Sequence, residues 1–255
     1  GSETASTVRS RGIYHFPYET SLLVYDDLQC SDLGNSVVNW GASPLNSYAM
    51  DTAADYSMGQ FVWTGFDYIG EPTPYNTKNS YFGIVDTAGF EKDSFWFYKS
   101  VWDIAYEKPF IRLSPCYWDF NEGQMIDIIA YSNLPVLKLR YGGKTYDSET
   151  LDHKSEGKLC AHFRVPYHKK LPIAVIGYYN ENCTNDNYAV EEVLFTPYET
   201  YKLRMRSDKN EITADGRSLA FITITAEDIT GQEVQNANNR IKFTVSGAGR
   251  LLGLD

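Results

Sequence analysis

The stretch from Gly59 to Tyr75, GQFVWTGFDYIGEPTPY, most constrains what this chain can fold into. It begins with Gln60–Thr64, an apolar and β-prone run that has the length of a buried strand. Acids, aromatic residues and residues that break regular structure follow at once. A barrel strand delivers side chains to an active-site face in this way. The alternative is an ordinary core strand that runs into a loop.

Several segments resemble a known enzyme family. GQFVWTGFDYIGEPTPY resembles the eighth-strand segment of the catalytic (β/α)8 TIM barrel in glycoside hydrolase family 2, the family of β-galactosidases, β-glucuronidases and β-mannosidases. Three further segments resemble the bacterial β-galactosidase branch of this family: YFGIVDTAGF (81–90), KDSFWFYKSVW (92–102) and the N-terminal GSETAS. The resemblance covers nearly the whole chain.

The expected fold class is α/β plus all-β. The resemblance implies the C-terminal part of a TIM barrel over residues 1–105. From Tyr106 onward, short alternating or apolar runs are separated by Asn, Gly and Pro, a pattern typical of a β-sandwich. By the resemblance, residues 106–196 form an immunoglobulin-like β-sandwich. Residues 197–255 then start a further, incomplete immunoglobulin-like domain, with strands expected in YKLRMRSD, LAFITITAED and RIKFTVSGAGRLLGLD.

Two helices are predicted in the first part of the chain. Residues 47–58 carry an apolar stripe at helical spacing. Lys92–Trp102 is the second helix, and its Phe95, Tyr98 and Trp102 recur at helical spacing. We expect this second helix to bury an aromatic face against the barrel.

Glu3 is the candidate nucleophile, because GSETAS matches the family segment that carries it. Retaining glycosidases use two carboxyl groups about 5–5.5 Å apart, one as nucleophile and one as acid/base. Arg9 or Arg11 is expected to help keep Glu3 ionised. The alternative is a solvated glutamate near a chain terminus.

The acid/base residue has no candidate in this chain. In the family it is the Glu of an Asn-Glu pair that lies well before the nucleophile. The Asn-Glu pairs here all follow Glu3, and their glutamates are Glu122, Glu181 and Glu211. We therefore expect that the acid/base segment is missing and that the 255 residues alone are inactive.

The remaining candidate site residues are expected to bind substrate. Trp63 would supply an apolar wall, and the resemblance places Phe82 near the pocket floor together with Asp86. Carboxylates and phenols select sugar hydroxyls, because an analogue without the hydroxyl leaves them unpaired. The candidates for these contacts are Asp67, Tyr68 and Glu71.

Composition excludes several classes of partner. The net charge of −10 argues against nucleic acid, whose binding needs a basic surface. The 4 cysteines have no zinc-site spacing, and we expect neither a metal nor a cofactor. No apolar run approaches the ~20 residues of a membrane span. A homo-oligomer is possible, because the incomplete last domain would leave an unpaired strand edge at which a second copy could associate. The compartment is unknown, with a periplasmic or secreted location favoured.

The resemblance to glycoside hydrolase family 2 implies a retaining β-glycoside hydrolase. The most favoured activity is that of a β-galactosidase acting on terminal β-galactosides. One alternative is a non-catalytic carbohydrate-binding or scaffold fragment, because the acid/base residue is missing. The other is β-glucuronidase specificity, but the Asn-x-Lys element that would pair with a uronate is not found between Phe82 and Lys92.

Overall fold

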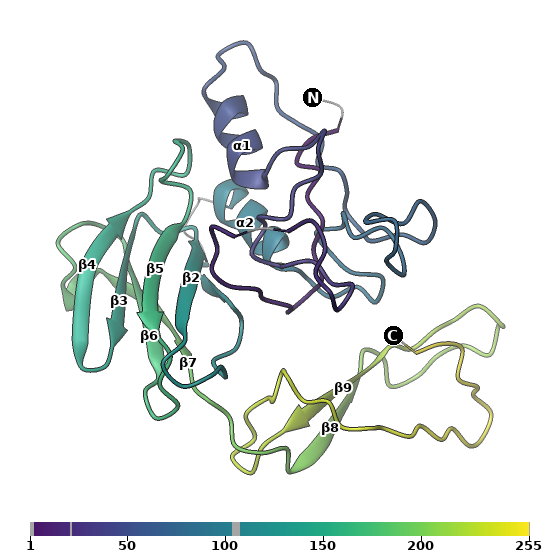
Figure 1. Cartoon of the computed structure of the whole chain (residues 1–255). Coiled ribbons are helices and arrows are strands. Elements are labelled where there is room, and N and C mark those ends of the chain that lie inside the picture. The colour runs from purple at the N-terminus through teal and green to yellow at the C-terminus, as the bar shows by residue number, and fades with distance from the viewer. Residues whose placement is uncertain (1–2, 21, 104–107, 255) are drawn as a thin grey trace. The chain divides into compact units, whose positions relative to one another are not determined.

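The computed structural model describes residues 3–20, 22–103 and 108–254. These residues form two compact units, one that ends at Leu194 and one over Phe195–Leu254. The expected boundary between residues 105 and 106 lies outside the described residues. The first unit contains both α-helices and two of the three β-sheets that the described residues form (Figure 1).

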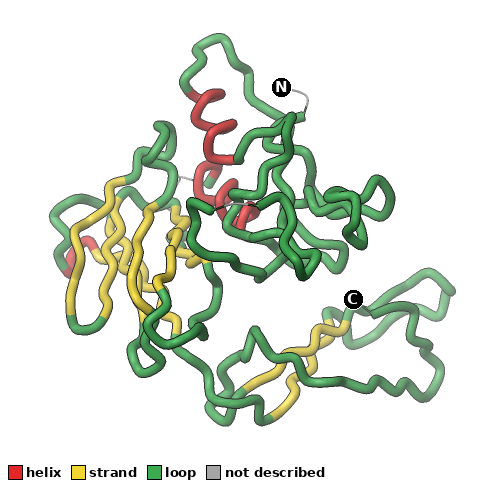
Figure 2. The backbone as a smooth tube through the Cα atoms, viewed as in Figure 1, coloured by secondary structure: helices red, strands yellow, loops and turns green. Residues whose placement is uncertain are grey.

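The expected barrel portion is not present, which corrects the sequence-based fold class. Over residues 3–20 and 22–103 the chain forms two helices joined by loops, and no regular strand (Figure 2). Val62, in the strand expected over Gln60–Thr64, forms only a single parallel bridge with Thr4, and a second single parallel bridge joins Phe66 to Val85. The chain turns at Gly59 and at Gly70, whose φ angles of 113° and 99° lie in the left-handed region. Because these turns flank residues 60–69, the pairing does not extend into a ladder.

Helix α1 spans Pro44–Thr52, three residues earlier than predicted. Its start is set by Ser43, whose side chain accepts a hydrogen bond from the backbone N–H of Asn46. Proline at the first helical position suits a place where no backbone donor is needed. The apolar spacing in residues 53–58 therefore lies beyond the helix end.

Helix α2 spans Asp93–Trp102, with Lys92 at its N-cap, which confirms the predicted position. The predicted aromatic face is only partly correct. Tyr98 is buried, but Trp102 is 58% exposed. Phe97 and Val101 complete the buried face instead. The buried face of the helix is thus formed by Phe97, Tyr98 and Val101, and not by Phe95, Tyr98 and Trp102 as predicted.

The β-sandwich expected after the helices is formed by two antiparallel sheets. One has the order β1-β2-β5 and the other β4-β3-β6-β7 (Figure 1). The strands are β1 (Ile111–Ser114), β2 (Met125–Ser132), β3 (Val136–Tyr141), β4 (Lys144–Thr150), β5 (Ala161–Pro166), β6 (Ile173–Tyr178) and β7 (Tyr188–Leu194), with the 3-10 helix η1 at Asn185–Asn187. Alternate residues of the strands in both sheets point inward and form the core, which surrounds the fully buried Trp118.

Strand β2 is buried on both faces and thereby joins the sandwich to the first part of the chain. Ile126 and Ile128 point into the core between the sheets. Ile129 and Tyr131 point to the other face, where they pack in one cluster with Phe97 of α2. Successive side chains of a strand point to opposite faces. The helix therefore covers the outer face of the three-stranded sheet.

The second unit contains an antiparallel pair, β8 (Lys202–Ser207) and β9 (Ile222–Glu227). Asp228 follows β9 and accepts a hydrogen bond from the backbone N–H of Tyr198 at 2.9 Å. Hydrogen bonds, chiefly from the Thr230 hydroxyl, lower the pKa of Asp228 to about 2. The strand expected over 240–255 is not formed in the described residues, because this segment has no partner ladder and its apolar side chains are exposed.

Candidate functional site

A pocket of about 460 Å³ in the first unit gathers five of the six predicted site residues. Three segments supply most of its wall, and Trp40 comes from a fourth. The lining residues are Glu3, Ser6, Trp40, Trp63, Tyr68, Glu71, Pro72, Thr73, Tyr75 and Phe82. The turn residues after residue 64 bring Tyr68 and Glu71 back beside Trp63.

The apolar side of the pocket has a fixed base. Phe82 is buried and packs in a cluster with Val8, Cys30 and Val38, against which Trp63 and Tyr68 are partly buried. The rings of Trp63 and Tyr68 meet edge to face, with centroids 6.0 Å apart at 84°. A rigid aromatic surface of this kind fits the apolar face of a pyranose.

The pocket also holds two carboxylates, Glu3 and Glu71, both exposed. Glu71 has a φ of 45°, in the left-handed region that non-glycine residues seldom adopt. Hydrogen bonds from the hydroxyls of Thr73 and Ser80 to the Glu71 carbonyl hold the backbone there. Strained residues of this kind are concentrated at ligand sites.

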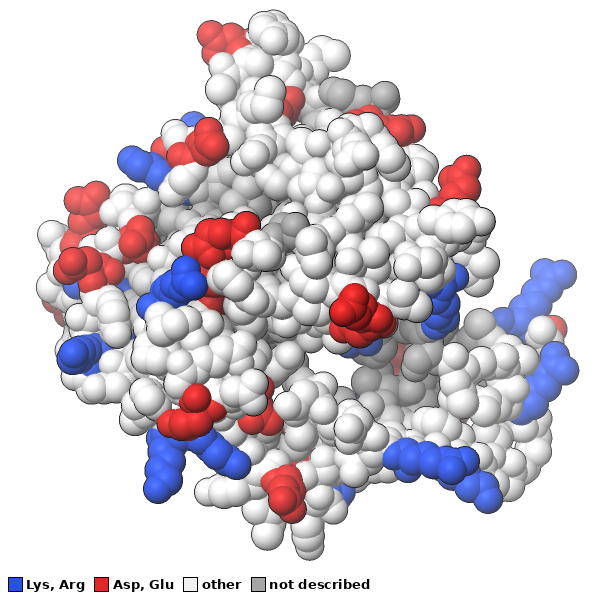
Figure 3. Space-filling model, viewed as in Figure 1, with Lys and Arg blue, Asp and Glu red and all other residues white. Residues whose placement is uncertain are grey.

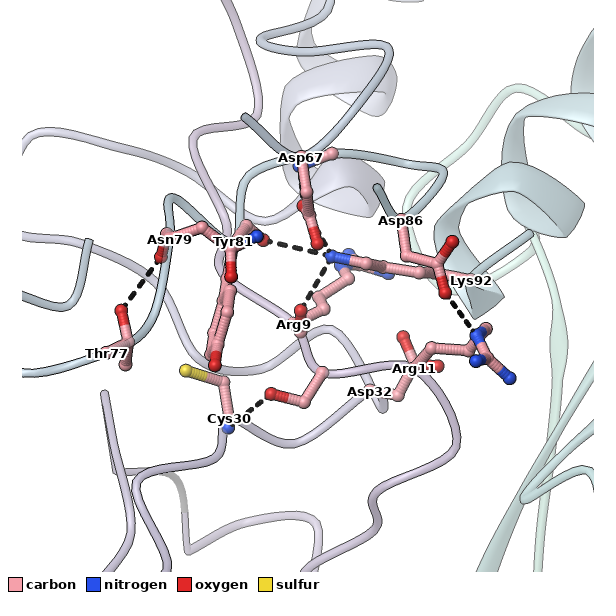
Figure 4. Close-up of polar contacts among 12 residues, drawn as sticks. Arg9, Arg11, Cys30, Asp32, Asp67, Thr77, Asn79, Tyr81, Asp86 and Lys92 are labelled. Atoms are coloured by element: carbon pink, nitrogen blue, oxygen red, sulfur yellow. Dashed lines mark hydrogen bonds and ion pairs between the residues drawn. The ribbon is translucent and has the colours of Figure 1, made fainter. Parts of the chain in front are cut away.

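Asp67 does not line the pocket. Its Oδ1 accepts hydrogen bonds from Lys92 Nζ at 2.7 Å and from the backbone N–H of Gly83 at 2.8 Å (Figure 4). Burial raises the pKa of the Asp67 carboxyl, and the ammonium of Lys92 opposes that rise. The predicted contact of Asp67 with a sugar hydroxyl stays a prediction, but this carboxylate already has buried partners.

Asp86 and the two cations expected near the nucleophile contact other parts of the chain. Arg11 forms an ion pair with Asp86 (Figure 4). Neither residue is among those that line the pocket. Arg9 is 2% exposed, and its guanidinium packs against Gly34, where a β-carbon would lie 2.6 Å from Nη2. The expectation that Arg9 or Arg11 stabilises the Glu3 carboxylate gains no support from these contacts.

Two more buried carboxylates meet where α2 begins. Asp32 accepts hydrogen bonds from the backbone N–H groups of Gly12 and Asp93, at 3.0 and 3.3 Å. Asp93 accepts one from the Ser114 hydroxyl, which ties α2 to strand β1. Burial, and next the charge of Asp32, raise the pKa of Asp93 to about 8.

Sequence reasoning missed half of the lining residues. Trp40 and Tyr75 are 75% and 91% exposed. Tyr75 ends the stretch that resembles the family, whereas only the excess of aromatic residues could have pointed to Trp40. Lys92 was predicted as the start of a helix and not as the partner of Asp67. Ser6 lies three residues after Glu3, on a segment whose side chains no periodic pattern orients.

The described residues have other properties that bear on function. No group of three or more His, Cys, Asp or Glu side chains among them could hold a metal ion. Within the same ranges, no helix has the length and apolar character needed to cross a membrane. Acidic side chains are scattered among uncharged ones over the face in Figure 3.

Comparison with known proteins identifies relatives of this sequence. The family model described as glycoside hydrolase family 2 C-terminal domain 5 matches residues 203–255. The chain is 33% identical over 266 residues to the beta-galactosidase BoGH2A of Bacteroides ovatus, with 100% of this chain and 30% of that protein covered. It is 24% identical over 266 residues to a putative beta-glucuronidase of Formosa agariphila, with 96% and 24% covered. The chain thus spans less than a third of these curated relatives.

Solved structures of similar fold also match. A beta-glycosidase from Bacteroides vulgatus superposes with a TM-score of 0.72 at 21% identity, over 91% of this chain and 32% of that chain. A beta-glucuronidase from glycoside hydrolase family 2 superposes with a TM-score of 0.71 at 19% identity, over 96% and 25%. At these identities the likeness concerns the fold alone.

Proposed function

Because this chain belongs to glycoside hydrolase family 2, we propose that it is the C-terminal part of a retaining β-glycosidase, and of a β-galactosidase in particular. The single observation that carries the proposal is the pocket, which brings Glu3 together with Trp63, Tyr68, Glu71 and Phe82. Glu3 and Phe82 lie far apart in the sequence, so their meeting is a property of the fold.

Glu3 acts as the nucleophile. Its carboxylate oxygen forms a bond to the anomeric carbon while the bond from that carbon to the glycosidic oxygen breaks. An acid elsewhere in the enzyme gives its proton to the leaving oxygen. Water then attacks the anomeric carbon and loses a proton to the same residue, which releases the sugar and restores the Glu3 carboxylate.

The other lining residues bind the sugar. Trp63 and Phe82 cover its apolar face, which excludes water from the reacting carbon. Tyr68 and Glu71 form hydrogen bonds with its hydroxyls, and a sugar without those hydroxyls leaves them unpaired. The role of Asp67 is to hold Gly83 and Lys92, so that its effect on the sugar is indirect.

The charge of the pocket favours a neutral sugar. No Lys, Arg or His is among the described residues that line it, whereas two carboxylates are. A uronate carries a carboxylate that needs a cationic partner. β-Glucuronidase, the activity in the name of the Formosa agariphila relative, is therefore the second candidate.

The test uses the whole enzyme that contains this chain. We expect it to hydrolyse an aryl β-galactoside faster than the matching aryl β-glucuronide. Glu3→Gln should abolish the hydrolysis with the melting temperature unchanged, because the amide keeps the shape and removes the nucleophilic charge. Undiminished turnover by this variant would exclude Glu3 as nucleophile. Preference for the glucuronide would overturn the galactosidase assignment.

A further inference from the structure

The side chain of Lys92 is fully buried and bonded to three separate parts of the chain. Its Nζ donates to Asp67 Oδ1 and to the carbonyl oxygen of Arg9, both at 2.7 Å, and to the carbonyl oxygen of Tyr81 at 3.4 Å (Figure 4). A lysine ammonium has three N–H donors. All of them are therefore used inside the protein.

These three acceptors lie on the segments that supply most of the pocket wall, which are residues 3–9, 63–75 and 81–82. The segments are also bonded directly to one another at the same place. Arg9 N–H donates to the Tyr81 carbonyl at 2.9 Å, and Gly83 N–H donates to Asp67. A β-carbon on Gly83 would lie 2.1 Å from the backbone nitrogen of Asp67. The backbones at Gly83 and Asp67 are therefore too close for any side chain at position 83.

Stability alone does not account for this arrangement. Burial lowers the pKa of Lys92, and the nearby Asp67 opposes that fall. Removing two charges from water costs as much as their attraction returns, and an apolar pair of similar shape often stabilises a protein equally well. An apolar side chain, however, cannot hold two backbone carbonyl groups in fixed places.

We propose that Lys92 is a positioning residue of the glycosidase site, whose ammonium fixes residues 3–9 and 81–82 against residues 63–75 and so holds Glu3 opposite the sugar-binding side chains. The proposal rests on the function proposed above. Lys92 touches no substrate, and it acts through the backbone of the pocket segments. A displacement of about 1 Å at a reacting group can cost roughly 10²-fold in rate.

The test separates two effects of Lys92: its ion pair with Asp67, and its hydrogen bonds to the carbonyl oxygens of Arg9 and Tyr81. In the whole enzyme, Lys92→Met leaves the buried Asp67 carboxylate without its cationic partner, and we expect both the melting temperature and kcat to fall. Adding Asp67→Asn removes the unpaired charge and keeps an acceptor for Gly83. The double variant should regain much of the melting temperature while kcat stays down roughly 10²-fold, with a smaller change in KM.

Single variants provide the controls. Asp67→Asn alone keeps Lys92 and its carbonyl partners, so its kcat is the reference for the double variant, which should lie roughly 10²-fold below it. Lys99→Met makes the same change on the same helix at a partly exposed position and should leave kcat unchanged. If Lys92→Met does not fold, the comparison of the double variant with Asp67→Asn decides.

The outcomes are distinct. A double variant that regains wild-type kcat together with its melting temperature would show that Lys92 only neutralises Asp67, and would overturn the inference. So would a double variant whose kcat equals that of Asp67→Asn alone. A wild-type enzyme without turnover on any aryl β-glycoside would instead refute the proposed function, and this inference with it.

Discussion

Asp93 is a buried carboxyl group whose ionisation is changed strongly by folding. It is 2% exposed, it lies beside the Asp32 carboxylate, and its pKa is raised to about 8. In the unfolded chain an aspartate titrates near its ordinary value of about 3.9. Between these two pH values the folded state binds more protons than the unfolded state, so the free energy of unfolding falls as pH rises.

Asp93→Asn should reduce this pH dependence. The variant keeps a side chain of similar shape that cannot ionise, so its melting temperature should fall less than that of the wild type between about pH 4 and pH 8. Each kcal/mol of difference corresponds to about 2–4 °C in a protein of this size. Thermal unfolding of both proteins across that range gives the measurement. Parallel curves would show that Asp93 is ionised in the folded protein.

Single residues were predictable where a local motif marks them. Glu3, Trp63 and Glu71 stand in segments that resemble a known family, and the pocket brings them together. The pairing of Asp67 with Lys92 was not predictable, because a buried carboxylate and a sugar-binding one look alike in a sequence. Their difference lies in which side chain folds against them.

At the scale of elements, α2 was predicted well and α1 less so. The bounds of α2 follow from its resemblance to the family segment, whereas the helical spacing of Phe95, Tyr98 and Trp102 identified its buried face only in part. In α1 the Ser43 cap and Pro44 decide the start, and they outweigh the apolar residues further along. The expected barrel strands failed because a parallel pairing depends on neighbours that local sequence does not reveal.

Strand β2 should be the element most sensitive to truncation, because it is buried on both faces. Ile128→Ala removes a side chain that is 2% exposed in the sandwich core and should cost about 2–5 kcal/mol. Met125→Ala, at the exposed start of the same strand, is the control and should stay within about 0.5 kcal/mol. Urea unfolding measures both. Equal losses of unfolding free energy in the two variants would mean that burial of Ile128 in the core does not contribute to stability.

At the scale of the whole molecule, the chain aligns with 30% of its beta-galactosidase relative. The described residues supply a nucleophile candidate and an apolar wall. We therefore expect little turnover of an aryl β-galactoside by the 255 residues alone, because general acid catalysis contributes about 10²–10⁴-fold. Robust turnover by this chain would show that the acid/base residue lies within it.

The most direct test of the account is to trap the covalent intermediate. A 2-deoxy-2-fluoro β-galactoside with a good leaving group slows the breakdown of a glycosyl-enzyme, because fluorine disfavours the oxocarbenium-like transition state. The whole enzyme would be incubated with this compound, digested and analysed by mass spectrometry. We predict that the fluorosugar is attached to Glu3. Attachment to any other residue, or inactivation without attachment, would contradict the central claim.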